Sequence, residues 1–453
     1  MIITTFFLLF VVFWLFKRRE YALVFLVLFT TNGFKIKFFG SQLTWDYNFL
    51  WFFENIFLIY GLFSNSFKKR LKDDRMLRFI CVSYLFFLVH FFLSVLLGAE
   101  EFGWAFTVLR QVTGPILLYV PLSSMSSWES KKAYTYLFVI VSVVCAFYLL
   151  QFLGLSIFLS NEGDSTGVVR SGYVRCIEFF VITSLFFYKR KYMSAIFWAP
   201  VIGGAARGSV TAILMSLLIV FKKKFLKLKY MVLFFVVLIP CMVVYVYVVA
   251  DNYRRYNISF VQEIQNGLNL SFISNPKNYL VNSNIRMDGG GTFGFRTAML
   301  AERVQYIVKN PKYLLFGCGM IAEQSPKNNF HFFLGTARDR YGGINQIWSV
   351  DILWVSFVLR FGFCGVLFWM IFFYLFYKRF SGLGTVAMAG RAFVLYLFIH
   401  SFGTMGPFNT ANMTLLVLLS AGLQTNNSRE EKNESFHSDC QLQHKKNDFR
   451  VSG

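Results

Sequence analysis

Apolar residues in this chain come in long runs that are separated by short basic or polar stretches. Many of the runs are about 15 to 25 residues long, the length that a helix needs to cross the hydrocarbon core of a bilayer. The pattern predicts an all-α, polytopic membrane protein of about 12–13 transmembrane helices with one large extracytoplasmic loop. The predicted spans are residues 2–16, 21–39, 47–63, 79–97, 105–122, 134–154, 173–188, 192–205, 209–221, 230–250, 350–376, 391–404 and 412–424.

The predicted spans fall into two groups on either side of a long polar interval. Residues 1–250 hold about ten spans and residues 350–424 hold about three, and the interval at 251–349 becomes the large loop. Residues 425–453 are polar and charged and have no apolar periodicity, which predicts a disordered tail. No internal repeat of the kind typical of many secondary transporters is apparent.

Basic residues gather between the apolar runs and predict the orientation of the chain. Cytoplasmic loops of membrane proteins are enriched in Lys and Arg. This rule places the loop at 251–349 outside, the C-terminal tail in the cytoplasm and, with about thirteen spans, the N-terminus outside. The first apolar run leads directly into a basic cluster and another span, so no cleavable signal peptide is predicted. The clusters are 17–19, 68–78, 189–191, 222–224 and 378–379.

Composition agrees with a membrane protein, and the distribution of the basic residues argues against a nucleic-acid partner. Of the 453 residues, 56% are hydrophobic, 20% are aromatic and only 15% are charged, whereas soluble proteins carry about 25% charged residues. Mean hydropathy is +0.52. The net charge of +22 could suggest a nucleic-acid partner. Because the basic residues lie in short clusters between apolar runs, we expect no nucleic acid to bind.

Cysteine and histidine give no sign of a metal centre or of a disulfide framework. The seven Cys form no Cys-x-x-Cys pair and most lie in apolar runs, and the five His are scattered. We therefore expect no metal site and no cofactor.

The large loop contains the most informative stretch of the chain, residues 294–365. Apolar residues between Thr297 and Lys309 follow one helical face, and Asn310-Pro311 ends that predicted helix. Residues 315–319, Leu-Phe-Gly-Cys-Gly, then predict a turn whose backbone can approach a ligand closely. The next apolar run opens at Asp351 and contains Gly362 and Gly365.

The order of these motifs resembles the large loop of the O-antigen ligase and Wzy-type polysaccharide polymerase superfamily. In that superfamily an Arg opens a loop helix, a turn ending in Gly-x-Gly follows, and a His-Asn or Asp-Asn pair precedes a helix with Gly-x-x-Gly. Arg296, Pro311 with the turn at 315–319, Asp351, and the pair Gly362 and Gly365 fill these places here. Ile352 replaces the usual Asn.

Several arginines lie on the predicted outer side, although Lys and Arg are usually enriched on the cytoplasmic side. An Arg at mid-membrane costs about 2.5–3.5 kcal/mol, so such a residue needs a polar partner or a polar cavity. Arg207 stands in a Gly-rich turn between two short apolar runs, and Arg170 and Arg175 precede another run. Each could simply extend its charged end to the membrane surface. The family resemblance implies instead that Arg170, Arg175, Arg207 and Arg296 bind a lipid diphosphate, which a planar guanidinium grips bidentately.

Asp351 has two interpretations of similar weight. It could cap the helix that begins beside it. Alternatively, it could be a general base that takes a proton from a sugar hydroxyl. Ligases of the family carry His at this place and many polymerases carry Asp, so Asp351 favours a polymerase.

Other residues carry weaker indications, each with a simple structural alternative. Arg303 lies seven residues after Arg296 and shares its helical face, where a solvated side chain is the ordinary outcome. Arg110 lies near the outer end of a predicted span, and the pair Glu100-Glu101 most simply belongs to a solvated loop or an ion pair. The remaining candidates are His331 as a catalytic group and Tyr306, Tyr341 and Trp348 as sugar-stacking rings.

The resemblance implies a metal-independent membrane glycosyltransferase on the outer face of the bacterial cytoplasmic membrane. Its substrates would be glycans on undecaprenyl diphosphate, polymerised into O-antigen, capsular polysaccharide or exopolysaccharide. Arg296 and Asp351 would be catalytic, with Arg170, Arg175, Arg207 and Arg296 on the diphosphate. The implied partners are the lipid-linked donor and acceptor and membrane lipids, with a chain-length regulator and a flippase as further candidates.

Alternative functions stay open at this point. An O-antigen ligase would transfer the finished glycan to lipid A-core. A lipid-linked oligosaccharide flippase or another transporter belongs to a different class and usually has short loops and polar residues along several spans. A non-catalytic scaffold would not need arginines on apolar ground outside the membrane.

Overall fold

The computed structural model describes parts of the chain, and most of the described residues are helical. The described residues are 17–30, 51, 54–56, 58–59, 62–63, 65–150, 176–187, 194–203, 207–222, 273–276, 291–322, 325, 332, 334, 336–337, 344–345, 352–382, 384–403, 409 and 411–421.

The described elements are helices and one small strand pair. The strands β1 (Thr336–Ala337) and β2 (Ile344–Asn345) are antiparallel. The coarse prediction of an all-α protein is therefore confirmed for the described part of the chain. The helices are α2 (Arg19–Thr30), α4 (Asn65–Asp73), α5 (Arg75–Leu96), α6 (Phe102–Leu117), α7 (Tyr119–Leu122), α8 (Ser127–Leu150), α9 (Ile177–Phe187), α10 (Ala195–Gly203), α11 (Arg207–Val220), α17 (Gly291–Lys309), the 3-10 helix η5 (Pro311–Tyr313), α18 (Leu353–Arg379), α19 (Thr385–His400) and the helix Ala411–Ala421.

Four helical stretches are long and apolar enough to cross a membrane: Arg75–Leu96, Phe102–Leu122, Ser127–Leu150 and Leu353–Arg379. They coincide with the spans predicted at 79–97, 105–122, 134–154 and 350–376. Shorter apolar helices occupy Ile177–Phe187, Gly208–Val220, Thr385–His400 and Ala411–Ala421. The spans predicted at 2–16 and 230–250 lie outside the described residues, so the total of about 12–13 stays a prediction.

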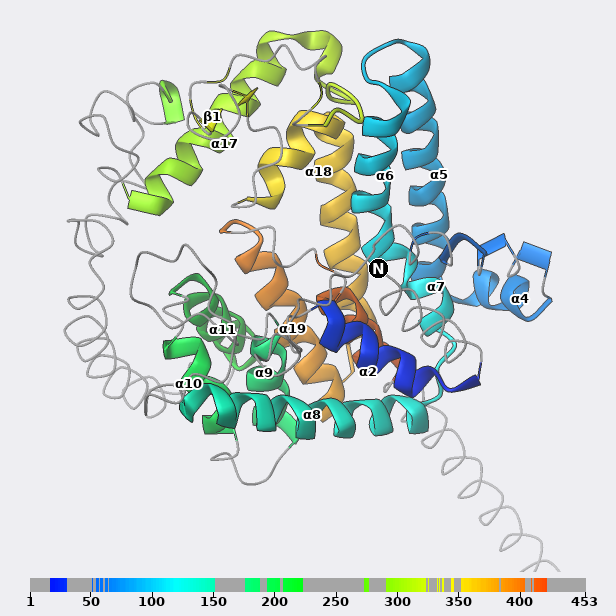
Figure 1. Cartoon of the computed structure of the whole chain (residues 1–453), viewed down its shortest axis with the longest axis vertical. Helices are drawn as coiled ribbons and strands as arrows, with labels where there is room; N and C mark the ends of the chain where they lie inside the picture. The colour runs from blue at the N-terminus through cyan, green and yellow to red at the C-terminus, as the bar shows by residue number, and fades with distance from the viewer. Residues whose placement is uncertain are drawn as a thin grey trace, which may run out of the picture.

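α5, α6 and α18 stand side by side, and α8 runs across the lower end of the molecule in Figure 1, packed on α2 and α10. Aromatic rings fill the space between α5 and α18. Phe87 of α5 meets both Phe361 and Phe368 of α18 edge-on, with ring centroids 5.1 Å apart in each pair. Such pairs favour this edge-to-face geometry because the ring edge is positive and the ring face negative.

Two of these helices also expose a continuous apolar stripe. On α5, Val82, Leu85, Val89, Phe92 and Leu96 are all exposed, at the spacing of one helical face. A similar stripe follows α18 through Phe363, Leu367, Met370 and Tyr374. Soluble proteins rarely expose contiguous apolar surfaces of this kind, which is consistent with helices that face lipid.

α18 is interrupted at Gly362, and the loop turn predicted at 315–319 docks into the interruption. Gly362 has φ 56° and ψ −145°, which no helical residue adopts. The N–H groups of Phe363 and Cys364 donate to the carbonyls of Leu314 and Leu315, both at 3.0 Å. The N–H groups that the break leaves without a partner in the helix are thus bonded to carbonyls of the turn.

N–H groups of the turn also donate to carbonyls of α18. Glycine in the turn allows the two backbones to approach this closely. The Cys318 N–H donates to the Leu359 carbonyl at 2.8 Å, and the Gly319 N–H donates to the Arg360 carbonyl at 3.1 Å. A Cβ on Gly317, which has φ +69°, would lie 2.3 Å from the Arg360 carbonyl carbon. The turn was predicted to let backbone approach a ligand; in the structure it approaches the backbone of α18.

Side chains of α5, of the loop that follows α5 and of α18 hold the chain that follows this turn. Glu100 is buried and accepts a hydrogen bond from the Ala322 N–H at 2.9 Å and another from the Ser325 hydroxyl. Ser94 accepts from the Met320 N–H at 2.9 Å, and Arg360 donates to the Ile321 carbonyl at 2.9 Å. The expectation that Glu100 belongs to a solvated loop or an ion pair is therefore wrong, because its oxygens are used to anchor the large loop.

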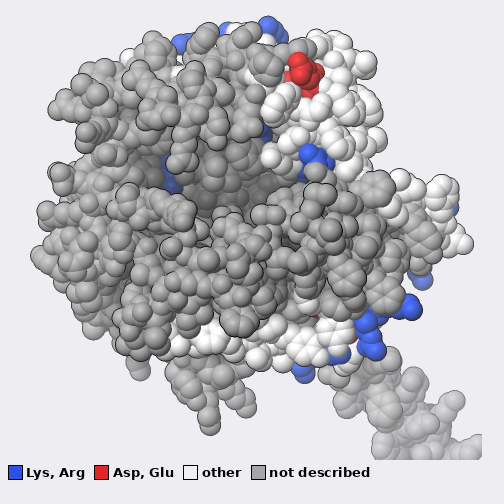
Figure 2. Space-filling model, in the orientation of Figure 1, with Lys and Arg blue, Asp and Glu red and all other residues white. Residues whose placement is uncertain are grey.

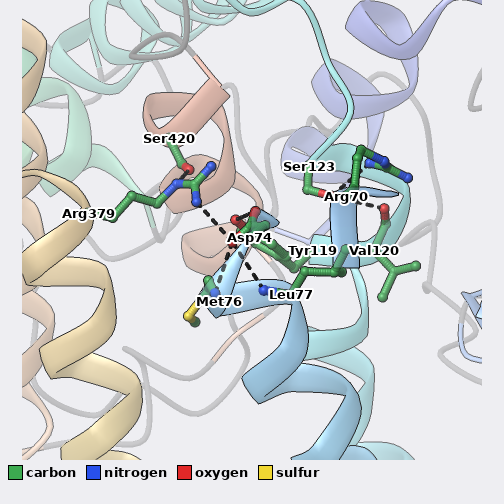
Figure 3. Close-up of polar contacts among 9 residues, drawn as sticks. All are labelled: Arg70, Asp74, Met76, Leu77, Tyr119, Val120, Ser123, Arg379 and Ser420. Atoms are coloured by element: carbon green, nitrogen blue, oxygen red, sulfur yellow. Dashed lines mark hydrogen bonds and ion pairs between the residues drawn. The ribbon is translucent and has the colours of Figure 1, made fainter. Parts of the chain in front are cut away.

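A polar cluster lies at the opposite end of α5 and α18 (Figure 3). Asp74 caps α5 by accepting from the Met76 N–H at 2.9 Å. Its carboxylate also accepts from Arg379 of α18 at 3.0 Å and from the Tyr119 hydroxyl at 2.7 Å. Arg379 in turn donates to Ser420. One carboxylate thus joins α5, the short helix α7, α18 and the helix Ala411–Ala421.

Candidate functional site

The C-terminal end of α19 is the point where α9, α11, α17 and α18 converge. The Leu353 N–H, at the start of α18, donates to the Ser401 carbonyl at 3.4 Å. The indole N–H of Trp354 donates to the Ser401 hydroxyl at 3.0 Å, and both groups are buried. The start of α18 is therefore fixed to the residue that follows α19.

A chain of polar side chains connects the same end of α19 to α11 and α9. The His400 Nε2 lies 3.3 Å from the Ser209 hydroxyl, and Ser209 donates to Glu178 Oε1 at 2.8 Å. The Tyr396 hydroxyl lies 2.9 Å from His400 Nδ1. We call this region the α19 junction; it consists of Glu178, Ser209, Arg296, Tyr396, His400, Ser401 and Gly403.

Both ring nitrogens of His400 have partners in the α19 junction. Nε2 faces the Ser209 hydroxyl at 3.3 Å, and Nδ1 faces the Tyr396 hydroxyl at 2.9 Å. Because Ser209 donates its proton to Glu178, its oxygen can accept a hydrogen bond from an N–H on His400 Nε2. His400 thus holds Ser209 in place.

Arg296, predicted to bind the diphosphate, reaches the α19 junction from α17. A Cβ on Gly403 would lie 3.5 Å from its Nη1, and the guanidinium is close enough to His400 to act on it electrostatically. The side chain is partly buried. The C-terminal end of a helix carries partial negative charge, so a cation here also stabilises the end of α19.

Arg207, another predicted diphosphate ligand, is the first residue of α11. Its side chain lies outside the described residues, but the backbone next to it is at the junction. A Cβ on Gly208 would lie 3.8 Å from the His400 ring. The first N–H groups of a helix have no partner within the helix and carry partial positive charge. The start of α11 and Arg296 thus place positive charge on two sides of His400.

The other predicted ligands cannot be placed in the same way. Arg170, Arg175 and Asp351 lie outside the described residues, as do His331, Tyr341 and Trp348. The helix that Asp351 was predicted to open begins at Leu353, which is bonded to the α19 junction.

Arg303 has a structural role that its spacing from Arg296 did not reveal. It is fully buried, pairs with Glu302 at 2.7 Å and donates to the Leu334 carbonyl at 2.7 Å. Its guanidinium lies 4.3 Å from the centroid of the Phe332 ring. Arg303 therefore holds Phe332 and Leu334 against α17. The expectation of a solvated side chain is wrong.

Two further residues of the loop are occupied by protein contacts. Tyr306 stacks on Tyr313, with ring centroids 6.1 Å apart, and meets Phe332 edge-on. Burial raises the pKa of the Cys318 thiol to about 12, so it stays protonated at neutral pH and is not a nucleophile. The structure gives no support to Tyr306 as a sugar-stacking ring, because its neighbours are aromatic side chains.

Arg110, on α6, is also held close to its own helix. Its guanidinium lies 5.0 Å from the centroid of the Phe106 ring and donates to the Thr107 hydroxyl at 3.2 Å. These contacts agree with the simple interpretation of a side chain that extends along an apolar surface.

The sequence reasoning missed every member of the α19 junction except Arg296. Glu178 and His400 each stand inside an apolar run, and an ionisable residue in such a run indicates a polar partner or a functional site. That observation could have found both. Ser209 and Tyr396 carry no comparable indication, because hydroxyl groups are common in apolar helices.

Figure 2 shows Lys and Arg side chains of the described residues at the top and at the lower right of the face seen in Figure 1. Across the described residues, no group of three or more His, Cys, Asp or Glu is placed to hold a metal ion.

No protein-family model, no curated protein and no solved structure matches this chain.

Proposed function

We propose that this protein is a membrane glycosyltransferase of the Wzy-type polymerase class, with its catalytic site at the α19 junction. The observation that carries the proposal is the meeting of Arg296 with the first turn of α11, which begins at Arg207, around the end of α19. These two arginines come from parts of the chain that are far apart, and the family resemblance assigns both to the diphosphate.

The proposed reaction joins a lipid-linked glycan to a second lipid-linked repeat unit. A hydroxyl oxygen of the acceptor sugar attacks the anomeric carbon of the donor, and the glycosyl–phosphate bond breaks. The electron pair leaves with undecaprenyl diphosphate, and Asp351 takes the hydroxyl proton. The negative charge that develops on the diphosphate is stabilised by Arg296, by Arg207 and by the first N–H groups of α11.

Arg170 and Arg175 complete the proposed diphosphate site, and the reaction needs neither a metal ion nor another cofactor. In this proposal the chain crosses the bacterial cytoplasmic membrane many times, and the loop at 251–349 faces outward. The loop turn lies beside the first half of α18, whereas Arg70 and Arg379 lie at its other end, and this arrangement supports that orientation.

A transport function is the second candidate, and one observation favours it. Glu178, Ser209, His400 and Tyr396 form a continuous polar chain across α9, α11 and α19. Ionisable residues inside apolar helices often mark proton pathways in transporters. A proton-coupled flippase for lipid-linked oligosaccharides would use such a chain, whereas a polymerase needs it only to position α11.

The test is polymerisation by the purified protein with lipid-linked repeat units as both donor and acceptor. Arg296→Ala should lower the rate about 100- to 1,000-fold, the usual effect of removing one donor that stabilises developing negative charge. Arg296→Lys should recover only part of the loss, because Lys cannot form the bidentate contact.

The matched control is Arg391→Ala, which removes an Arg from α19 that donates to the Gly382 carbonyl far from the junction. It should polymerise at the parental rate. Equal activity of Arg296→Ala and the parent would refute the proposal. Movement of the lipid across vesicles without polymer would favour the flippase, and transfer only to lipid A-core would favour the ligase.

A further inference from the structure

Buried carboxyl groups in the described part of the chain are, with one exception, hydrogen-bonded or ion-paired. Glu20 lies 3.4 Å from Lys132. Glu100 accepts from the Ala322 N–H at 2.9 Å, and Glu178 accepts from the Ser209 hydroxyl at 2.8 Å. The exception is Glu54.

Glu54 is one of three consecutive described helical residues, 54–56, and is 1% exposed. Neither of its carboxyl oxygens has a hydrogen-bond partner within the part of the chain that the structure describes. The ion pairs formed by the described residues do not include it either. Its oxygens are therefore shielded from water without any replacement for the water they lose.

The surroundings of Glu54 explain why no donor reaches it. Its Oε2 lies against α6, 3.9 Å from where a Cβ on Gly114 would stand. The nearby donors are already used: Trp51 Nε1 donates to Thr113 at 2.8 Å, and the Tyr84 hydroxyl donates to Asn55. Thr113 itself donates to the Leu109 carbonyl.

The charged and titratable groups on the neighbouring helices do not compensate Glu54 either. On α5, Tyr84 is near enough to interact with it electrostatically, but a phenol carries no positive charge at neutral pH. On α6, Arg110 is one turn before Gly114, and its guanidinium lies over the Phe106 ring. No cation faces the carboxyl group from the described residues of these helices.

From this geometry we propose that Glu54 is a proton-binding site: a carboxyl group that holds a proton, and is therefore uncharged, at neutral pH inside the bundle. A buried carboxylate with neither a cation nor a hydrogen-bond donor is far less stable than the neutral acid. The ligand of this site is the proton. The proposal is independent of the arginine site at the α19 junction and requires no polysaccharide substrate.

Infrared difference spectroscopy tests the protonation state directly. Full-length protein is reconstituted in lipid at neutral pH, and the spectrum of Glu54→Gln is subtracted from that of the parent. We expect a C=O stretch of a protonated carboxylic acid that shifts to lower frequency in D2O. The control is Glu101→Gln, because Glu101 is exposed to solvent. Its difference spectrum should lack the acid band.

A second variant keeps the test decisive if Glu54→Gln folds poorly. Glu54→Asp retains the carboxyl group but shortens its side chain, so the acid band should shift in frequency and remain present. Glu54→Leu should unfold at or above the parental temperature, because it removes a buried polar group that has no partner. Carboxylate bands in the Glu54→Gln difference spectrum, or a loss of stability in Glu54→Leu, would overturn the proposal.

Discussion

At His400, hydrogen bonds to two side chains fix the imidazole ring in one orientation. Tyr396 lies one turn earlier on the same helix, whereas Ser209 belongs to α11. The ring therefore connects the start of α11 to the end of α19. If the arginines at this junction bind a diphosphate, His400 acts as a positioning residue, because it sets where α11 begins relative to Arg296.

Replacing His400 by Gln or by Asn tests its contacts with Ser209 and with Tyr396 one at a time. The Gln amide nitrogen falls near the place of Nε2 and can still donate to Ser209, whereas the Asn amide reaches only the place of Nδ1. We expect the His400→Gln variant to bind the lipid-linked donor with nearly the affinity of the parent protein. His400→Asn should raise KM roughly fivefold with a smaller change in kcat, since a typical hydrogen bond contributes about 1 kcal/mol.

The measurement is steady-state polymerisation at varied donor concentration, with thermal unfolding of each variant recorded as the control for folding. A merely structural role would lower the unfolding temperature of both variants without separating their KM values. An Asn variant equal to or better than the Gln variant would contradict the positioning role.

Asp351→Asn distinguishes a helix cap from a general base. Asn keeps the size and much of the capping ability of Asp, so a cap should survive the change with little loss. A base would not, and polymerisation should fall about a hundredfold to ten-thousandfold at equal folding stability. Undiminished polymerisation by purified Asp351→Asn would leave the base to be found elsewhere.

At the level of elements, the break in α18 is the feature on which the large loop depends. The turn at 314–319 exchanges backbone hydrogen bonds with both sides of Gly362. Such an exchange requires contact between two backbones, which side chains at Gly317 and Gly362 would prevent. The glycines that resemble the family motifs therefore have a packing role that holds whether or not the protein is a polymerase.

Gly362→Ala should destabilise the protein by about 1–3 kcal/mol, because φ 56° is strained for alanine. The added Cβ would also lie 2.6 Å from the Leu314 carbonyl oxygen. Thermal unfolding in detergent measures the effect. Gly103→Ala is the control, since nothing lies within 4 Å of its Cβ position and alanine favours a helix. Equal unfolding temperatures for the two variants would show that the break tolerates a side chain.

At the scale of the whole molecule, the two ends of α18 differ in chemistry. The turn and the Glu100 contacts lie beside its first half, whereas Asp74, Arg70 and Arg379 lie at its other end. Exposed lysines of α4, including Lys68, extend the basic end. The predicted orientation, with the basic clusters on one side of the membrane and the large loop on the other, requires such a separation and stays a prediction.

Labelling with a membrane-impermeant maleimide tests the orientation. In a background without the native cysteines, Lys312→Cys beside the turn should react in intact cells with the outer membrane opened. Lys69→Cys on α4 should react only after the inner membrane is permeabilised. Both positions are exposed, so access to the reagent is limited by the membrane alone. The reverse pattern would contradict the orientation and, with it, an outward-facing α19 junction.

Local patterns in the sequence determined the helices and one of their ends. The predicted helix at 297–309 lies within α17, which ends at Lys309 as expected, because Pro311 cannot continue it. The apolar runs gave the long helices, because a run of such length can bury its backbone polar groups only by bonding them within a helix. The domain boundaries at 250, 349 and 424 remain predictions.

Only the tertiary structure decided which polar residues have partners. Arg296 and Arg303 stand on one helix with similar sequence surroundings, yet one reaches the end of α19 and the other is buried against Leu334. Likewise, Glu100 anchors the loop while Glu54 is buried without a donor. The physical reason is that helix formation depends on neighbours a few residues away, whereas a hydrogen bond between helices depends on how distant segments pack, which periodicity along the chain does not encode.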